Sequence, residues 1–315
     1  MSSDKVSIVL SVDIECYSGD YEREVFSQGL GLPYILACLK AYGVSATFFV
    51  ETLGATRWGI SDSQRICHDI AEVGQEIQLH LHPSVAKLDG FVDKDDVLWN
   101  QEAVTQERLL RVGLDVLTQC GVKATAFRAG DFAANGATLM AMKRAGLLIS
   151  SNRDLDTKSS IRSKINHDFP VVNDVSCCDG IVDVPVTAFR SPWPNLDGQF
   201  RHFEISALSF REMKDGLMKA YRAGCATVGI LTHPGEFFRN TKRGVVPIEK
   251  NRRRLEQLLG FITSRPEFKV CTISECAAIT TMPKHSPPEI KLALPYTLLR
   301  VVEQGIDRIR AKLGR

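Results

Sequence analysis

The sequence lacks the segments and the charge that would indicate a membrane-spanning, exported or nucleic-acid-binding protein. No apolar run approaches the roughly 18 residues that a transmembrane helix needs. The N-terminal stretch MSSDKVSIVLSVDIE has no apolar region followed by a small-residue cleavage site. The net charge is only +2, so the chain offers little electrostatic attraction for nucleic acid. We therefore expect a cytoplasmic protein that does not bind nucleic acid.

Two further absences narrow the class of fold. The nine cysteines are odd in number and include no CxxC pair, which favours reduced thiols over a disulfide framework. The segment after the first apolar run reads IECYSGD, which is neither a GxGxxG turn nor a Walker loop. These absences argue against a disulfide-stabilised scaffold and against a nucleotide-binding fold.

What the sequence does contain is a regular alternation of strand-like and helix-like segments. Short apolar runs rich in β-branched residues occupy 6–13, 46–51, 76–83, 124–130, 147–151, 181–187, 226–234 and 268–274. Segments with helical spacing, each followed by a glycine, occupy 32–42, 63–73, 100–120, 134–145 and 209–223. This order predicts a parallel sheet with outer helices. About eight units favour a distorted (β/α)7–8 barrel over an open doubly wound sheet.

The C-terminal part of the chain differs in character from the rest. Residues 281–315 begin with a proline-containing, linker-like stretch and continue with helical spacing of apolar residues over 296–313. The apolar positions are Leu298, Val302, Ile306, Ile309 and Leu313. We predict a barrel over residues 1–280, followed by a linker and an amphipathic helix. This helix either packs on the barrel or contacts a membrane surface or a partner subunit.

Polar side chains gather at the ends of four of the predicted strands. They are Asp13 and Glu15 after the first run, His80 and His82 in the third, Arg128 in the fourth and His233 in the seventh. The carboxyl ends of parallel barrel strands meet at one mouth, where catalytic sites lie. A single buried histidine is more often a satisfied core residue, but the coincidence on four strands favours a shared functional site.

The spacing within two of these pairs indicates a metal site. Residues i and i+2 of a strand point to the same face, so Asp13 and Glu15 share a face, as do His80 and His82. Two imidazoles and one carboxylate are a typical protein ligand set for catalytic Zn²⁺ or a similar divalent ion. The second carboxylate is then available as a base. Taken singly, either acid would instead suit a helix cap or a salt bridge.

These residues resemble the motifs of the polysaccharide deacetylases, carbohydrate esterase family 4, which have the NodB-homology fold. The first motif is a strand ending in two acids, here Asp13 and Glu15, where the family usually has Asp in the second place. The one-residue gap between them is that of atypical, cytoplasmic members. The second motif follows Gly-x-Glu-Ile, matched by 74–77, and leads to His80. Ser84 replaces the family's second histidine, and His82 is the alternative ligand.

Three later motifs extend the resemblance over about residues 6–276. The segment RAGDF at 128–132 is similar to Arg-x-Pro-Tyr/Phe-Gly without its proline, and 231–233 match Leu-x-His. For the fourth motif, Asp183 and Trp193 are candidates only. The resemblance implies that Asp13 is the general base, oriented by Arg128, and that His233 is the general acid. It also implies metal ligation by Glu15 and His80, with His82 added from strand geometry.

The resemblance implies a metal-dependent C–N hydrolase that removes an acetyl group from an acetamido sugar. It implies one divalent ion, zinc, with cobalt, nickel, manganese and iron as alternatives. In the cytoplasm the substrate would be a sugar nucleotide or a lipid-linked saccharide of surface-polysaccharide biosynthesis. Candidate substrate contacts are Asp131, Phe132, Trp193 and Glu236. An amide hydrolase for a non-sugar substrate and a catalytically silent metal- or carbohydrate-binding protein stay open as alternatives.

Two irregular segments interrupt the alternation of strands and helices. Residues 154–179 are polar, and 189–203 (FRSPWPNLDGQFRHF) combine aromatic, arginine and turn residues. Long loops at a barrel mouth are often functional, although the aromatic residues would equally serve to pack the loop. The basic run at 250–254 fits a solvated helix face or an anionic substrate. Cys16, on the opposite face from the two acids, is expected to be a buried thiol.

Overall fold

A nine-stranded sheet, curled into a distorted barrel, organises the chain. The computed structural model describes residues 5–91, 95–155, 163–192, 199–279 and 282–312, without the side chains of 306–312. Seven parallel strands follow the order β10-β1-β2-β3-β4-β5-β7, and β6 pairs antiparallel with β7. Their bounds are β1 Val6–Ile14, β2 Thr47–Glu51, β3 Glu76–Leu81, β4 Ala126–Ala129, β5 Ile149–Ser150, β6 Ser176–Cys178, β7 Ile181–Asp183 and β10 Thr227–Thr232. The predicted distorted (β/α) barrel is confirmed.

The eighth predicted strand, β13 (Phe268–Val270), is shorter than expected and does not close the barrel beyond β10. It pairs with the first residues of β1, on the edge where β2 pairs with the last ones. The chain leaves β13 after three residues and enters α8 (Ile273–Ile279). Beside β10 the barrel is instead completed by irregular chain, where Ile205 and Leu231 join their backbones by a hydrogen bond.

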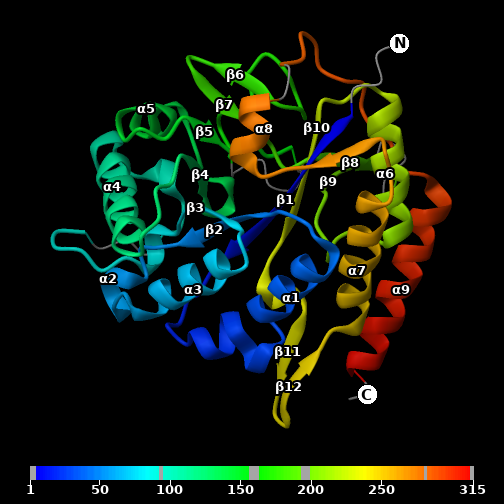
Figure 1. Cartoon of the computed structure of the whole chain (residues 1–315), viewed down its shortest axis with the longest axis horizontal. Coiled ribbons are helices and arrows are strands. Elements are labelled where there is room, and N and C mark those ends of the chain that lie inside the picture. Colours follow the sequence, from blue (N-terminus) through cyan, green and yellow to red (C-terminus); the bar gives the residue numbers. More distant parts are fainter. Residues whose placement is uncertain (1–4, 92–94, 156–162, 193–198, 280–281, 313–315) are drawn as a thin grey trace.

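Helices cover the outside of the sheet (Figure 1). Their bounds are α1 Leu32–Tyr42, α2 Ala55–Trp58, α3 Ser61–Glu72, α4 Ala103–Gln119, α5 Gly136–Arg144, α6 Phe210–Arg222, α7 Glu249–Thr263 and α9 Leu294–Lys312. The five helices predicted from spacing are α1, α3, α4, α5 and α6. The glycine after each has a φ between 62° and 82°, the left-handed conformation that ends a helix without a Cβ clash.

Two antiparallel hairpins were not predicted. Strands β8 (Ala188–Ser191) and β9 (Gln199–His202) form one, within the aromatic segment at 189–203. Strands β11 (Phe238–Thr241) and β12 (Gly244–Pro247) form the other, which projects from the lower edge in Figure 1. Both consist of short strands with weak apolar alternation, so tertiary packing rather than local pattern selects them.

Strand β1 lies at the centre of the core. All nine of its residues are buried, because neighbouring strands and helices cover both of its faces. A carboxylate in such a strand, Asp13, is only 3% exposed. A charge buried to this degree requires a partner, which the site supplies.

The C-terminal helix α9 packs beside α6 (Figure 1), through a polar contact rather than through its apolar residues. Arg300 is 1% exposed, and its Nε lies 3.0 Å from the buried carboxylate of Glu212 on α6. Helical spacing places Arg300 on the face opposite the apolar residues, and this polar face is the buried one here because Glu212 requires a buried cation. Leu298 and Val302 face solvent at 42% and 58% exposure. Ile306, Ile309 and Leu313 lie outside the described side chains.

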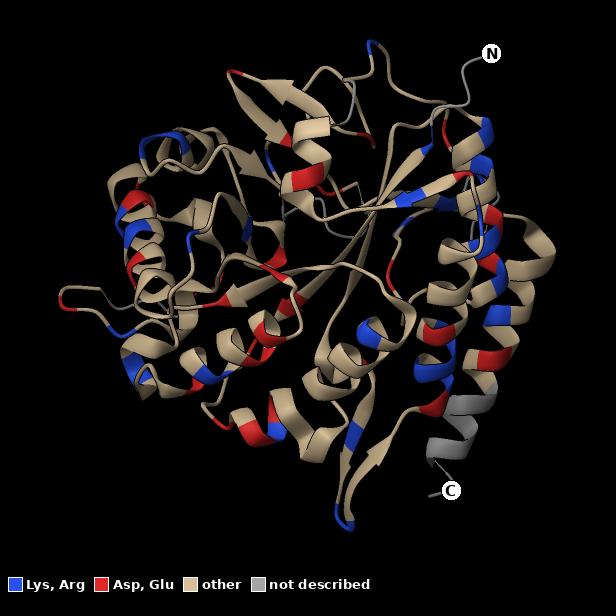
Figure 2. Cartoon of the chain, viewed as in Figure 1, with Lys and Arg blue, Asp and Glu red and all other residues tan. Residues whose placement is uncertain are grey.

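Charged residues are dispersed over the surface. Lys and Arg lie on the outer helices, interleaved with Asp and Glu (Figure 2). The basic run at 250–254 belongs to α7, but Arg254 is buried and donates to the carbonyl groups of Ile205 and Ser206, so the run is only partly a solvated face. Among the described residues, no helix is both long and apolar enough to span a bilayer.

Candidate active site

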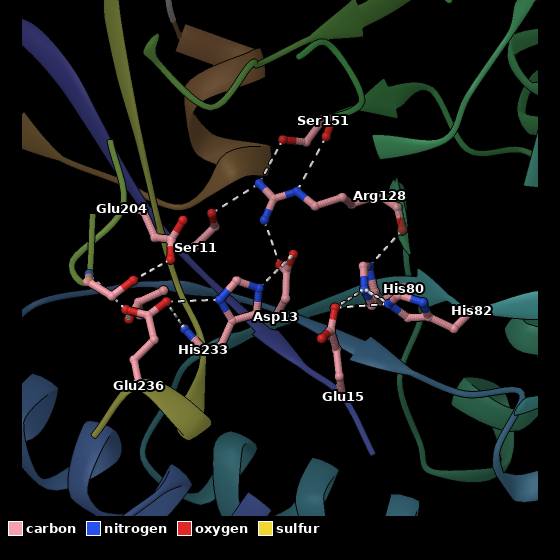
Figure 3. Close-up of polar contacts among 12 residues, drawn as sticks. Ser11, Asp13, Glu15, His80, His82, Arg128, Ser151, Glu204, His233 and Glu236 are labelled. Carbon is pink, nitrogen blue, oxygen red and sulfur yellow. Dashed lines mark hydrogen bonds and ion pairs between the residues drawn. The ribbon is translucent and has the colours of Figure 1, made fainter. Parts of the chain in front are cut away.

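Four strands deliver the predicted residues to one end of the barrel (Figure 3). Asp13 lies near the end of β1, and Glu15 follows that strand. His80 lies in β3, Arg128 lies in β4, and His233 directly follows β10. Each of β3, β4 and β10 runs straight into a short 3₁₀ turn, respectively Pro83–Val85, Gly130–Phe132 and Pro234–Glu236. These turns fix the direction of the chain immediately after the functional side chains.

Three ligand-type atoms converge beside β1. Oε1 of Glu15 lies 3.0 Å from Nε2 of His80 and 2.9 Å from Nε2 of His82, and the two imidazole nitrogens are 3.1 Å apart. Ligands about 2.0–2.1 Å from a tetrahedral zinc ion would be separated by about 3.3 Å. The three atoms thus have nearly the spacing that a small divalent ion requires.

The hydrogen bonds behind these ligands set the right tautomers for a metal. Nδ1 of His80 donates to the carbonyl oxygen of Arg128 at 2.8 Å, and Nδ1 of His82 donates to the carboxylate of Asp96. A neutral ring held in this way would offer Nε2 to a cation, as metal-ligating histidines do. Burial raises the pKa of Glu15, but hydrogen bonds and charges from the two histidines outweigh it and hold that pKa well below its ordinary value. The residues present fit a divalent ion.

Two other groupings of acids and histidine are close enough to hold an ion, but their atoms are already engaged. One includes Asp13, whose Oδ1 lies 2.5 Å from Nη1 of Arg128. A cation beside that guanidinium would be repelled. The other includes His233 and Glu236, which hydrogen-bond to each other. Glu15, His80 and His82 are therefore the better metal ligands.

Asp13 is held rigidly but not by the metal-ligand group. Arg128, 2% exposed, donates to Asp13 and also to the hydroxyl groups of Ser11 and Ser151, at 3.0 and 2.8 Å. Its guanidinium carbon stacks 4.2 Å from the ring centroid of Phe49. Oδ2 of Asp13 stays on the pocket side, 4.0 Å from Nε2 of His233. The arrangement gives an oriented carboxylate between an imidazole and the metal-ligand group.

His233 is oriented by a carboxylate three residues further along the chain. Oε1 of Glu236 accepts from Nδ1 of His233 at 2.9 Å and from its backbone nitrogen at 3.1 Å. Burial lowers the pKa of His233, but Glu236, with further charge from Asp13 and Glu15, raises it to about 10. Nε2 of the imidazole points into the pocket as a proton donor.

Two of the other candidate residues, Glu236 and Asp183, do not line the pocket, and a third is not described. The second oxygen of Glu236 accepts from Thr232 and from the backbone of Ser206, so Glu236 lies behind His233 rather than on the pocket wall. Asp183 is fully buried and pairs with Arg153 at 2.7 Å, a structural ion pair. Trp193 lies outside the described residues.

The turn after β4 places Asp131 and Phe132 on the pocket wall, as predicted. Both have φ values in the left-handed region, 53° and 56°, which costs a non-glycine residue about 1–3 kcal/mol. Gly130, just before them, packs against His82, because a Cβ there would lie 2.3 Å from Cε1 of that ring. The close approach of Gly130 therefore limits the space available to the ring of His82.

Tyr17 is a pocket residue that the sequence reasoning missed. Its hydroxyl lies 3.3 Å from Oε2 of Glu15 and 3.1 Å from Nε2 of His82, at the open side of the metal-ligand group. Asp13, Glu15 and Tyr17 stand at i, i+2 and i+4, so the alternation that paired the two acids could have found it. Cys16, between them, is buried as expected.

The pocket is open to solvent and has a volume of about 130 Å³. Its lining comprises Asp13, Glu15, Tyr17, Ala129, Asp131, Phe132, His202, Glu204, Leu231 and His233. His202 and Glu204 were also missed, since they come from the β8–β9 hairpin and the segment after it. Asp96, which holds His82, was missed as well, and no local pattern marks it.

Comparison with known proteins gives likeness in structure but not in sequence. The sequence matches no model of a protein family and no curated protein. A candidate polysaccharide deacetylase from Mycobacterium smegmatis has a similar structure, with a TM-score of 0.56 and 18% identity over 92% of this chain and 96% of that one. A 4-alpha-glucanotransferase from Thermococcus litoralis also reaches 0.56, with 12% identity over 92% of this chain and 42% of its own length. A family 4 carbohydrate esterase from Streptomyces lividans has a TM-score of 0.45 and 11% identity, over 89% of this chain and 98% of that one.

Two equally similar structures are thus named for different reactions, one as a deacetylase and one as a glucanotransferase. The fold alone does not show which reaction, if either, this chain catalyses. The choice depends on the side chains at the barrel mouth. What the likeness does establish is architecture: this chain has a NodB-type barrel, as in the polysaccharide deacetylase structure from Mycobacterium smegmatis.

Proposed function

We propose that this protein is a metal-dependent hydrolase that removes the N-acetyl group of an acetamido sugar. The observation that carries the proposal is the convergence of Oε1 of Glu15 with Nε2 of His80 and Nε2 of His82, three possible ligand atoms about 3 Å apart. A divalent ion placed among these atoms would have two imidazoles and one carboxylate as ligands. Zinc suits this ligand set best, with cobalt, nickel, manganese and iron as alternatives.

Asp13 is the proposed general base. A bound divalent ion would polarise the acetyl carbonyl group and acidify the attacking water. Asp13 lies next to the metal-ligand group and is fixed by Arg128, so its free oxygen is placed to accept the proton of that water. The roles of the two N-terminal acids therefore differ: Glu15 holds the ion and Asp13 takes a proton.

His233 is the proposed general acid. Departure of an amine requires a proton at the nitrogen, and Nε2 of His233 opens into the pocket on the other side of Asp13. Glu236 keeps the imidazole protonated above neutral pH and fixes its orientation. Glu236 is thus proposed as a positioning residue rather than a substrate contact.

Tyr17 supplies a hydrogen-bond donor at the open side of the metal-ligand group. A phenol is protonated at neutral pH, and burial together with nearby carboxylates raises the pKa of Tyr17 further. We propose that this hydroxyl donates to the acetyl oxygen as negative charge develops on it.

The finer features of the function are proposals that follow from the sequence. We propose a saccharide substrate such as a sugar nucleotide or a lipid-linked intermediate of surface-polysaccharide biosynthesis, met in the cytoplasm. Exposed Leu294, Leu298, Leu299 and Val302 on α9 support a contact of this helix with a membrane surface or a partner subunit.

The proposal is tested by incubating the zinc-loaded protein with N-acetylated sugar nucleotides, chitooligosaccharides and simple acetanilides while acetate is measured. Acetate release from an acetamido sugar, abolished by a chelator and restored by zinc, is the expected result. Release from acetanilides alone would indicate a non-sugar amide hydrolase. Stoichiometric zinc binding without acetate from any compound would indicate a silent binding protein.

A further inference from the structure

A second histidine lines the pocket without a role in the proposed reaction. His202 ends β9, whereas the metal-ligand candidates come from β1 and β3. Its side chain is 7% exposed, and its Nε2 lies 2.5 Å from Oδ1 of Asp154, whose side chain is 1% exposed. A buried imidazole–carboxylate pair on the wall of a pocket is a candidate functional group.

The other ring nitrogen of His202 is left for a ligand. Nδ1 makes no hydrogen bond among the residues that the structure describes. His202 lines the pocket, which is open to solvent, so we take Nδ1 as the atom that meets a ligand there. Because Asp154 accepts the hydrogen of Nε2, the neutral ring presents a lone pair at Nδ1. That atom accepts a hydrogen bond from an O–H or N–H group.

The polar groups that line the pocket beside His202 are also hydrogen-bond acceptors. Asp131 and Glu204 line the pocket together with His202, and no lysine or arginine among the described residues lines it. The ring of Phe132 meets the imidazole edge-to-face, with centroids 5.1 Å apart, and so fixes its orientation. An anionic group placed here would face two carboxylates, whereas hydroxyl groups would find three acceptors.

We propose that His202, held by Asp154, forms with Asp131 and Glu204 a subsite that binds the hydroxyl groups of a neutral sugar ring. This inference rests on the proposed function and names its substrate class. The ring bound in the pocket is a neutral, hydroxyl-rich acetamido sugar, and it carries no carboxylate or phosphate where it meets these three side chains.

Calorimetric titration of the zinc-loaded protein with N,N′-diacetylchitobiose tests the subsite directly. His202→Phe retains an aromatic ring but removes the acceptor, and we expect the dissociation constant to rise at least tenfold. His68→Phe is the matched control, because that histidine lies on α3 with 72% of its side chain exposed. N-acetylneuraminic acid, an anionic acetamido sugar, should bind the wild type at least tenfold more weakly than the neutral disaccharide. Equal affinity of the wild type and His202→Phe, or no binding of the disaccharide by the wild type, overturns the subsite.

A second variant changes the hydrogen-bonding character of the ring without removing it. In Asp154→Asn the amide can donate to Nε2, which leaves the hydrogen on Nδ1 and turns the acceptor into a donor. We expect a loss of disaccharide affinity similar to that of His202→Phe. Unchanged affinity in a folded Asp154→Asn protein contradicts the proposed polarity of Nδ1.

A substrate without a sugar separates this inference from the proposed function. Hydrolysis of 4-nitrophenyl acetate needs only the metal-ligand side of the pocket, so His202→Phe should change its kcat less than twofold. An equal loss on this ester and on the disaccharide would mean that His202 is merely structural. If the wild type binds the disaccharide through His202 but releases no acetate from any compound, the hydrolase proposal fails while the subsite stands.

Discussion

The two walls of the pocket are built in different ways. One wall consists of residues at strand ends, with Asp13 and Glu15 at the end of β1 and His233 after β10, and the two histidines of the metal-ligand group lie behind Glu15. The other wall consists of irregular chain, with Asp131 in the turn after β4 and His202 at the end of a short hairpin. The groups proposed to react thus lie at the ends of buried barrel strands, and those proposed to bind the sugar lie on the turn and the hairpin outside the barrel sheet.

The histidines near the two walls also differ in where the nitrogen that makes no protein hydrogen bond through its hydrogen points. His80 and His82 each have Nδ1 engaged by the protein, so only Nε2 remains, and it faces Glu15. His202 also has one nitrogen engaged, but its free nitrogen faces the pocket rather than a ligand cluster. Histidine therefore has two proposed roles in this protein, metal ligand and sugar-binding acceptor, and the role depends on where the nitrogen that the protein does not engage points. The predictions below concern substitutions at or beside the strand-end residues. These variants should have a lower kcat or a lower zinc affinity, whereas variants at His202 should have a lower affinity for the sugar.

The largest effect is expected from Asp13→Asn. The asparagine retains the shape of the side chain but cannot accept a proton from water, so kcat should fall about 1,000-fold. The metal content should stay near one ion per chain in elemental analysis, because Asp13 is not in the ligand group. Glu15→Gln, in contrast, should lose the ion. If Asp13→Asn loses metal and Glu15→Gln retains it, the two roles are reversed. Thermal unfolding is the control, since Arg128 loses its buried partner.

Tyr17→Phe should have the next largest effect. Loss of a hydrogen-bond donor to a developing oxyanion costs about 100-fold in kcat, whereas zinc affinity, measured by competition with a chelator, should be unchanged. Tyr42→Phe, at the exposed end of α1, is the matched control. A tenfold weaker zinc affinity in Tyr17→Phe would show that the phenol is a ligand instead of a donor.

Gly130→Ala should weaken the metal site through His82. The added methyl group would lie 2.3 Å from Cε1 of that ring, and the ring has no free direction because Asp96 and Glu15 hold its two nitrogens. We expect zinc affinity to fall about tenfold to 100-fold, as for other disturbed ligand orientations. Gly136→Ala is the control, since a Cβ at that position meets nothing within 4 Å. Unchanged zinc affinity in Gly130→Ala would mean that His82 is not a ligand.

The strand wall could be predicted from the sequence because its information is local. Alternation by two residues pairs Asp13 with Glu15 and His80 with His82, and parallel topology brings the strand ends together. The same alternation includes Tyr17, so Tyr17 could also have been predicted as a site residue. We predict that His80 and His82 bind the metal and that Ser84 does not, and metal-binding measurements on variants test this.

On the other wall Asp131 and Phe132 were predicted, but His202 and Glu204 could not be, because their positions depend on chain far apart in sequence. His202 faces the pocket only because β8 and β9 pair with Ala188 opposite it, and Asp154, its partner, is 48 residues away. Similarly, the buried position of Arg300 depends on Glu212, 88 residues earlier. Helical spacing alone does not show which face of α9 packs on the barrel, since an isolated pattern does not show a buried carboxylate on a neighbouring helix.

The smallest effect is expected from Glu236→Gln, and it should depend on pH. Burial raises the pKa of Glu236 to about 7, so above neutral pH its charge helps to hold the pKa of His233 near 10. Glutamine removes that charge, and the pKa of His233 should fall toward its ordinary 6.5. Because the general acid must be protonated, activity is lost as pH rises through this pKa. The alkaline limb of the kcat profile should therefore move to lower pH by at least about one unit. At pH 6, where Glu236 is already losing its charge, the two proteins should differ only a few-fold. A uniform loss at all pH values would indicate that Glu236 merely orients the turn after β10.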